Sequence, residues 1–373
     1  MRLHGQELGA RELAARTGET AAAGGVRLVT LGDGSERGIR ALEFRTGSGL
    51  AFDVLVDRCM DIGAAEHCGQ SFGWRSRTGF RHPGLHEHAD EDGLSWLRSF
   101  SGLTVTGGLD HTLFGGEVDA DTYRYPPRGT VRHGLHGRVA NIPARLTGYG
   151  ERWSGEQCVL WAEGEVRQAA VFAENLRLTR RIEADVGGDE IRLTDTVTNP
   201  GFDPTPHMFL YHINLGWPLL DDGSRFLAPV EKTLWQTDSV TEQGIDHRTL
   251  PGPQPRFVEQ VYEHALAPCD DAGRTGAALV NDRLGLALSV EWSLSAFPCF
   301  FQWLNLRAGD YAVGLEPSTH HVAGDAEARA DGTMIWLGPG ESRTYRTHFR
   351  VHRGAEAIEA LEAQLNPLEP RHV

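Results

Sequence analysis

The chain has 373 residues, of which 40% are hydrophobic and 23% are charged, so it carries enough apolar material for a large folded core. Its net charge of −15 argues against nucleic acid as a partner, because binding to phosphates needs a basic surface. No apolar run approaches the length of a membrane span, and residues 1–17 lack the basic and apolar segments of a signal peptide. We therefore expect a globular protein of the cytoplasm.

The cysteines are odd in number and form no CxxC pair, which argues against a disulfide framework and against a structural zinc site. Reduced and mostly buried thiols are the simplest interpretation. The five are Cys59, Cys68, Cys158, Cys269 and Cys299.

The N-terminal part of the chain changes from a helical to a strand pattern. Residues 6–16 place small and apolar side chains at helical spacing, which predicts a short helix inside an N-terminal extension of residues 1–24. The Gly-, His- and Pro-rich residues 70–92 predict a long loop, and such loops often border a site. The alternation that follows the helix predicts strands at 26–31, 38–44 and 50–56. Further on we expect a helical turn at 94–100, a strand at 102–110 and a loop at 114–130.

The strongest strand pattern runs from Cys158 to Thr198, with a tight turn at Gly187 and Gly188. The Pro-containing residues 224–270 predict loops. The sequence contains too few helical patterns for alternating βαβ units. One further helix is expected at 354–365, within a C-terminal helix and tail of residues 354–373. We therefore predict one all-β domain over residues 1–373, a large antiparallel β-sandwich with a few short peripheral helices. Its remaining strands are expected at 208–215, 276–280, 284–292, 298–306, 311–316, 333–337 and 342–352.

Three titratable side chains lie in settings that suit proton transfer. His212 lies in the apolar run 208–215, and Glu316 lies in an apolar run where burial would raise the carboxyl pKa toward useful base strength. His136 precedes a glycine that permits close approach of backbone or ligand. Each also has a structural interpretation, since a strand glutamate can pair with an arginine and a strand histidine can be a hydrogen-bonded core residue. Taken singly, none of the three decides the function.

A polar, histidine-rich region could bind a metal ion. Its histidines are His82, His86 and His88, and His111 would add to them if it lay nearby. Their spacing fits no standard zinc template, however, and such a run is typical of a solvated loop. We expect neither a metal nor another cofactor.

Several short motifs follow one another in a recognisable order. They are His136-Gly137-Arg138 with Asn141-Ile142-Pro143 after it, Tyr211-His212-Ile213-Asn214, and Leu315-Glu316-Pro317. This order resembles the aldose 1-epimerase, or galactose mutarotase-like, superfamily from about residue 25 to residue 352. Segments 56–63 and 338–342 look more like its little-characterised bacterial branch than galactose mutarotase itself. The resemblance implies a β-supersandwich with the site in a concave cleft.

The resemblance also implies mutarotation, in which the sugar ring opens, C1 rotates and the ring closes on the other face. In this sequence Glu316 would take the proton from the anomeric hydroxyl and His212 would give one to the ring oxygen. His136 would help to hold or polarise that oxygen. The residue chemistry agrees, because acid and base must flank one hemiacetal.

Further side chains are candidates for substrate binding. Sugar rings favour aromatic faces and planar hydrogen-bonding groups, and arginines could clamp an anionic sugar, although structural ion pairs are an equal interpretation for them. The ring-binding candidates are Trp74, Tyr211, Gln302 and Trp303, and the arginines are Arg58, Arg75 and Arg138. Asp61 and His111 complete the predicted substrate contacts.

Two other functions stay open at this point, because a fold does not determine its chemistry. The same glutamate and histidine could serve an aldose–ketose isomerase or a C–H epimerase, with or without the assistance of a metal. A non-catalytic carbohydrate-binding protein is the third hypothesis. In each case the expected partner is a small carbohydrate, and exposed sheet edges make a homodimer plausible.

Overall fold

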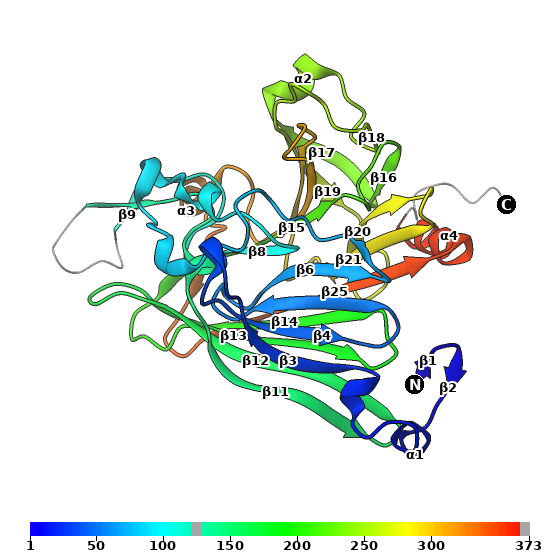
Figure 1. Ribbon diagram of the computed structural model, residues 1–373. Coiled ribbons are helices and arrows are strands. Elements are labelled where there is room, and N and C mark those ends of the chain that lie inside the picture. Colours follow the sequence, from blue (N-terminus) through cyan, green and yellow to red (C-terminus); the bar gives the residue numbers. More distant parts are fainter. Residues whose placement is uncertain (121–128, 366–373) are drawn as a thin grey trace.

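The computed structural model describes residues 1–120 and 129–365, which fold mainly into antiparallel sheets with a few short helices (Figure 1). Three sheets of nine, seven and five strands dominate this part of the chain. The predicted all-β antiparallel sandwich is therefore confirmed. The predicted loop at 114–130 and the C-terminal tail both fall partly outside the described residues, at 121–128 and 366–373.

The nine-stranded sheet is made of long strands with one buried face. In β13, every second side chain from Leu176 to Ala184 is buried, as the period of two in the sequence predicts. The turn between β13 and β14 contains Gly187 with a positive φ of 81°, which glycine adopts without strain. In sheet order the strands are β11 (Arg145–Ser154), β12 (Gln157–Ala169), β13 (Asn175–Asp185), β14 (Glu190–Thr198), β25 (Ser342–Arg353), β21 (Leu286–Ser293), β20 (Arg274–Asn281), β16 (Ser224–Leu227) and β18 (Thr249–Leu250).

The five-stranded sheet packs against the nine-stranded sheet, with β3 lying against β11 and β12 (Figure 1). Its inner face adds stacked rings of Phe44 and Phe52, whose centroids are 4.6 Å apart, to the core. The order is β3 (Gly25–Thr30), β4 (Arg40–Arg45), β5 (Leu50–Leu55), β6 (Asp61–His67) and β7 (Gln70–Ser71).

The seven-stranded sheet positions the candidate site, and its strand β15 is buried along its whole length. Phe209, Tyr211 and Ile213 pack into the main core, which also contains residues of the other two large sheets. The even-numbered residues between them face the opposite side, because side chains alternate along a strand. The order is β17 (Val230–Gln236), β19 (Gln260–Leu266), β22 (Cys299–Asn305), β23 (Ala312–Ser318), β15 (Thr205–Gly216) and β24 (Ile335–Leu337), and β8 (Thr104–Leu109) also pairs with β15.

Some predicted elements differ from the structure. The helix expected at 6–16 is shortened to α1, since residues 6–7 pair with β1 as a strand. Residues 224–270, expected to be loops, contain β16, β17 and β19, and the prolines lie between these strands. The predicted C-terminal helix is present as α4. The helices are α1 (Ala10–Ala14), α2 (Asp238–Gln243), α3 (Gly324–Ala330) and α4 (Ala355–Leu365), and the short strands are β1 (Arg2–Leu3), β2 (Gln6–Glu7), β9 (Gly116–Asp119) and β10 (Thr130–His133). Among the described helices, none combines the length and apolarity that crossing a bilayer requires.

A buried ionic network lies between the sheets. Arg180 on β13 donates to both oxygens of Asp195, at 2.9 and 2.6 Å, and to Asp61 Oδ1 at 2.7 Å. The hydroxyl of Tyr211 donates to the same Asp195 at 2.6 Å. One guanidinium thus pairs with two carboxylates that are almost completely removed from water.

We expect Arg180→Met to destabilise the fold by about 3–5 kcal/mol, because it leaves two buried carboxylates without their cation. Urea unfolding followed by tryptophan fluorescence measures this change. Arg27→Met is the matched control. Arg27 pairs with Glu43 at the exposed surface, where a salt bridge contributes less than about 1 kcal/mol. Equal losses in the two variants would contradict a special role for the buried network.

Candidate active site

The candidate site lies on the face of the seven-stranded sheet that points away from the main core. The register of β15 and β23, with Leu210 opposite Ser318 and Ile213 opposite Leu315, places His212 across from Glu316. On the next strand, β22, Phe301 lies opposite Glu316. Strand β15 and the two consecutive strands β22 and β23, which come much later in the sequence, thus present one continuous surface.

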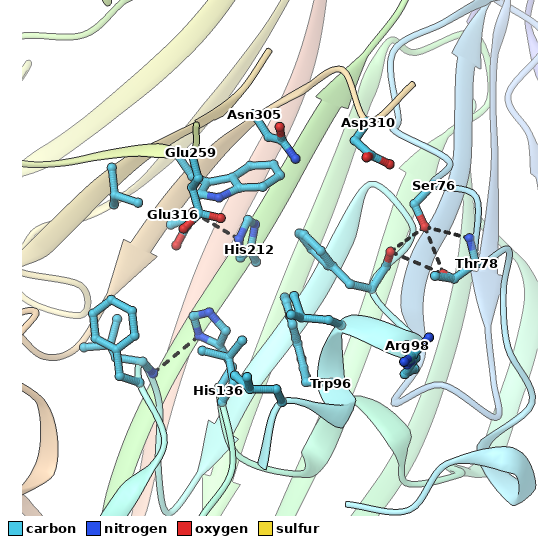
Figure 2. Close-up of a pocket in the computed structure, with 18 of the residues that line it drawn as sticks. Ser76, Thr78, Trp96, Arg98, His136, His212, Glu259, Asn305, Asp310 and Glu316 are labelled. Carbon is cyan, nitrogen blue, oxygen red and sulfur yellow. Dashed lines mark hydrogen bonds and ion pairs between the residues drawn. The ribbon is translucent and has the colours of Figure 1, made fainter. Parts of the chain in front are cut away.

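This surface forms the base of a cavity of about 720 Å³, a size typical of sites for small molecules. The strands supply the base, and the wall comes from residues 74–78, 91–100, 113–114 and 135–136. Figure 2 shows Glu316 and His212 pointing toward one another, with Ser76, Thr78 and Arg98 on the far side of the cavity. The loop predicted at 70–92 and the helical turn predicted at 94–100 do border this cavity.

His212 and Glu316 form a buried pair, with side chains only 4% and 5% exposed and with Nε2 and Oε1 3.2 Å apart. Burial raises the pKa of Glu316 well above its ordinary value, and the negative charge of Glu259 raises it further. Burial also lowers the pKa of His212 well below its ordinary value, and His136 adds to this effect. Apart from this contact with His212, Glu316 Oε1 has no hydrogen-bond partner among the described residues. Buried polar atoms without partners are rare in proteins and point to a bound ligand or water.

Gly314 creates the space that this pair occupies. A Cβ atom at this position would lie 2.8 Å from Oε1 of Glu316 and 3.0 Å from Cε1 of His212. It would also lie 3.0 Å from Cβ of Trp303, which is opposite Gly314 on β22. The glycine before Leu315-Glu316-Pro317 is therefore required by the packing of the site itself.

His136 lies in a tight segment next to β8. A Cβ atom on Gly137 would lie 2.4 Å from the carbonyl oxygen of His111, so only glycine fits there. The backbone N–H of Leu113 donates to Nδ1 of His136 at 3.4 Å, which leaves the proton on Nε2. Burial lowers the pKa of His136 to about 3, so the ring is neutral. His136 therefore offers an uncharged N–H donor within the lining of the cavity.

Aromatic rings enclose His212. Phe100 meets it edge-on with centroids 4.6 Å apart, and Trp303 does so at 5.2 Å. Trp96 stacks on Phe100 at 4.2 Å and also contacts His136 at 4.8 Å. These rings shield the imidazoles from water and give the cavity flat apolar walls.

Several of the lining residues were not predicted from the sequence. The acids Glu259 and Asp310 and the arginines Arg77 and Arg98 lie in the outer part of the cavity. Arg77 pairs with Asp310 at 2.8 Å, and Arg98 pairs with Glu91 at 2.7 Å. No sequence motif marked these residues. The missed aromatic and amide residues are Trp96, Phe100, Phe114, Phe301 and Asn305.

Of the predicted ring-binding residues, Trp74 and Trp303 line the cavity, but Tyr211 and Gln302 do not. Tyr211 follows the alternation of β15 and donates its hydroxyl to Asp195 on the core side. Gln302 points away from Trp303 and bonds to His247, whose Nδ1 lies 2.9 Å from its Oε1. Both corrections follow from the strand period, because neighbours on a strand face opposite sides.

The predicted charged contacts also lie outside the cavity. Arg58 is buried and donates to the carbonyl oxygens of Ala140, Arg81 and Ser99, so its guanidinium is structural. Arg75 pairs with Glu36 at 2.6 Å. These interactions replace the anion clamp considered from the sequence. Likewise Asp61 accepts from Arg180 and Thr106, His111 Nε2 lies 2.9 Å from the carbonyl oxygen of Phe114, and Arg138 is not among the lining residues.

The histidines that were weighed as metal ligands in the sequence have other partners in the structure. His82 Nδ1 accepts from the N–H of Gly84 at 3.0 Å, and His86 Nδ1 lies 3.1 Å from Ser99 Oγ. Within residues 1–120 and 129–365, neither they nor His88 and His111 belong to a group of three ligand atoms close enough for one ion.

Comparison with solved structures identifies the class of fold. A protein from Klebsiella pneumoniae subsp. pneumoniae MGH 78578 that is proposed to be an aldose 1-epimerase matches with a TM-score of 0.82 at 24% identity, over 93% of this chain and 88% of that chain. A galactose mutarotase-like protein from Clostridium acetobutylicum matches with a TM-score of 0.60 at 12% identity, over 88% and 98%. Galactose 1-epimerase from Lactobacillus acidophilus NCFM matches with a TM-score of 0.53 at 12% identity, over 88% of this chain and 99% of that chain. The predicted galactose mutarotase-like fold is thereby confirmed.

The chain belongs to the DUF4432 family, a domain of unknown function, whose model matches residues 36–351. Among curated proteins, none matches this chain.

Proposed function

We propose that this protein is an isomerase of the aldose 1-epimerase type, which interconverts the anomers of a sugar by acid and base catalysis. The observation that carries the proposal is the buried pair of His212 and Glu316, whose Nε2 and Oε1 atoms lie 3.2 Å apart in the lining of the cavity. The anomeric oxygen and the ring oxygen of a hemiacetal are bonded to the same carbon. An acid and a base that serve them must therefore be close neighbours, as these two side chains are.

In the proposed mechanism one proton is shared by the pair throughout. Glu316 takes the proton of the anomeric hydroxyl while His212 gives a proton to the ring oxygen, and the ring opens. The pair then consists of a neutral carboxyl and a neutral imidazole, which is the form that burial favours. Burial favours this neutral form over the charged pair from which the step begins, both in the free protein and at the ring-opened stage.

His136 has a supporting role in this mechanism. Its neutral ring presents Nε2–H as a donor, which suits the ring oxygen or a neighbouring hydroxyl of the sugar. The rings of His136 and His212 are 5.6 Å apart, so one monosaccharide can contact both. The two arginines among the lining residues are ion-paired, which favours a neutral sugar over an anionic one.

The proposal is tested by anomer exchange. The purified protein is added to a panel of neutral aldoses, and exchange between α and β anomers is followed by NMR saturation transfer. Faster exchange for at least one sugar is expected. Deuterium from solvent appearing on a sugar carbon would instead indicate isomerisation or C–H epimerisation, because mutarotation exchanges only O–H protons. Binding without exchange would indicate a carbohydrate-binding protein, and either result would overturn the proposal.

The pH dependence of the rate should be bell-shaped, because only the pair that holds one proton is active. The acid limb reports His212, whose pKa is lowered, and the alkaline limb reports Glu316, whose pKa is raised. Removing the charge of Glu259 should lower the pKa of Glu316. Glu259→Gln is therefore expected to move the alkaline limb to lower pH and to leave the acid limb in place. An alkaline limb that stays fixed or rises in this variant would contradict the assignment.

The cytoplasmic location and the homodimer remain predictions within this proposal. We also predict that the substrate is a free or modified carbohydrate and that the proton transfer needs no cofactor. Gel filtration with light scattering measures the oligomeric state.

A further inference from the structure

A second group of side chains with metal-binding chemistry lies next to the cavity, outside the proposed catalytic pair. Its members are Glu263 on β19, Cys299 at the start of β22 and His321 in the segment after β23. Their ligand atoms, one from each residue, all lie within 4.8 Å of one another. In the described part of the chain this is the one group of at least three such residues.

The three side chains come together through the same strand alternation that builds the cavity. Glu263 is two residues after Val261, and Cys299 is two residues before Phe301, so each shares a face with a residue of the cavity lining. Val322, next to His321, also lines the cavity and donates its N–H to Glu263 Oε2 at 3.3 Å. The group therefore continues the floor of the cavity along β19 and β22.

The surroundings of Glu263 differ from those of an ordinary surface pair. Its side chain is buried and contacts Nδ1 of His321, whose side chain is 60% exposed. A second imidazole–carboxylate pair, His348 with Glu190 at 2.6 Å, has no third ligand atom beside it among the described residues. The buried thiol of Cys299 distinguishes the first pair from the second.

From this arrangement we infer that Glu263, Cys299 and His321 form a site for a divalent cation of zinc type. Zinc accepts thiolate, imidazole and carboxylate ligands, and tetrahedral coordination places such ligand atoms about 3.3–3.6 Å apart. The three ligand atoms lie within 4.8 Å of one another, and His321 must give up its direct contact with Glu263 to meet this requirement. Binding releases the thiol proton to solvent, and the exposure of His321 leaves room for water as the fourth ligand.

The test is a zinc titration of the full chain after removal of metals with a chelator. Isothermal titration calorimetry should give one zinc ion per chain, and each of Cys299→Ser, Glu263→Gln and His321→Asn should weaken binding on the order of tenfold or more. Cobalt binding should give a thiolate-to-metal charge-transfer absorption that Cys299→Ser abolishes. The matched controls are His348→Asn, from the pair without a thiol, and Cys68→Ser, which removes an exposed thiol.

The variants also separate a metal site from a structural contact. His321 is largely exposed, so His321→Asn should fold normally even if Cys299→Ser does not. Zinc should raise the melting temperature of the wild type but not that of His321→Asn. Absence of zinc binding at micromolar concentrations would overturn the inference. So would unchanged zinc affinity in the three ligand variants, or an equal loss of affinity in the two controls.

Discussion

Replacing Glu316 by Gln should reduce anomer exchange by about 10²- to 10⁴-fold, because the amide cannot take the proton of the anomeric hydroxyl. The substitution keeps the shape of a side chain that is only 5% exposed, so the fold should persist. His212→Asn should cause a loss of similar size, since it removes the partner that carries the shared proton. The rate constants for α to β exchange, measured by saturation transfer, check both losses.

A buried glutamate outside the cavity provides the control for this experiment. Glu174 is also buried, and burial raises the pKa of its carboxyl, but it does not line the cavity. Glu174→Gln should therefore retain the exchange rate of the wild type. Full activity in both Glu316→Gln and His212→Asn would show that the pair does not carry the proton transfer. Partial losses that simply multiply in the double variant would show that the two groups act independently.

Replacing Gly314 by Ala should reduce the exchange rate by about 10²-fold without any change in a titratable group. The added methyl would overlap Oε1 of Glu316 and Cε1 of His212, so at least one of the two must move. Displacements of this size at an acid–base pair cost about two orders of magnitude in rate. The effect should appear in kcat, measured at saturating sugar.

Gly116 in β9 is the matched control for this substitution, because a Cβ atom there would meet no atom within 4 Å. Gly116→Ala should leave the rate and the melting temperature unchanged. In the Glu316→Gln background, Gly314→Ala should cost little more, because the interaction that it disturbs is already lost. A full additional loss in the double variant would place the effect of Gly314 elsewhere, for example in the packing of Trp303.

The alternation of side chains in the sequence determined where strands form and which of their faces are buried, which the short motifs alone did not. The alternation in residues 176–184 predicts one buried face of β13, and the apolar run around His212 predicts a buried strand. The same period of two predicts that Tyr211 faces away from a cavity lined by its neighbour His212. It likewise predicts that Gln302 faces away from a cavity lined by its neighbour Trp303. Such alternation depends only on the backbone, which directs successive side chains to opposite faces.

The tertiary structure decided which strands became neighbours and therefore what the site contains. His212 and Glu316 meet because β15 and β23 pair in one register, which no pattern within either strand specifies. Trp96 and Phe100 reach the site from a helical turn that follows a long loop. Glu259 lies just before β19, in a region whose prolines had predicted a loop. The sequence made Arg58 a candidate for binding an anion, but in the structure its guanidinium donates to backbone carbonyl oxygens. The sequence by itself determined the strands, their buried faces and the order of the motifs. The partners of each side chain depend on contacts between residues far apart in the sequence, such as His212 and Glu316, and these contacts exist only in the folded chain.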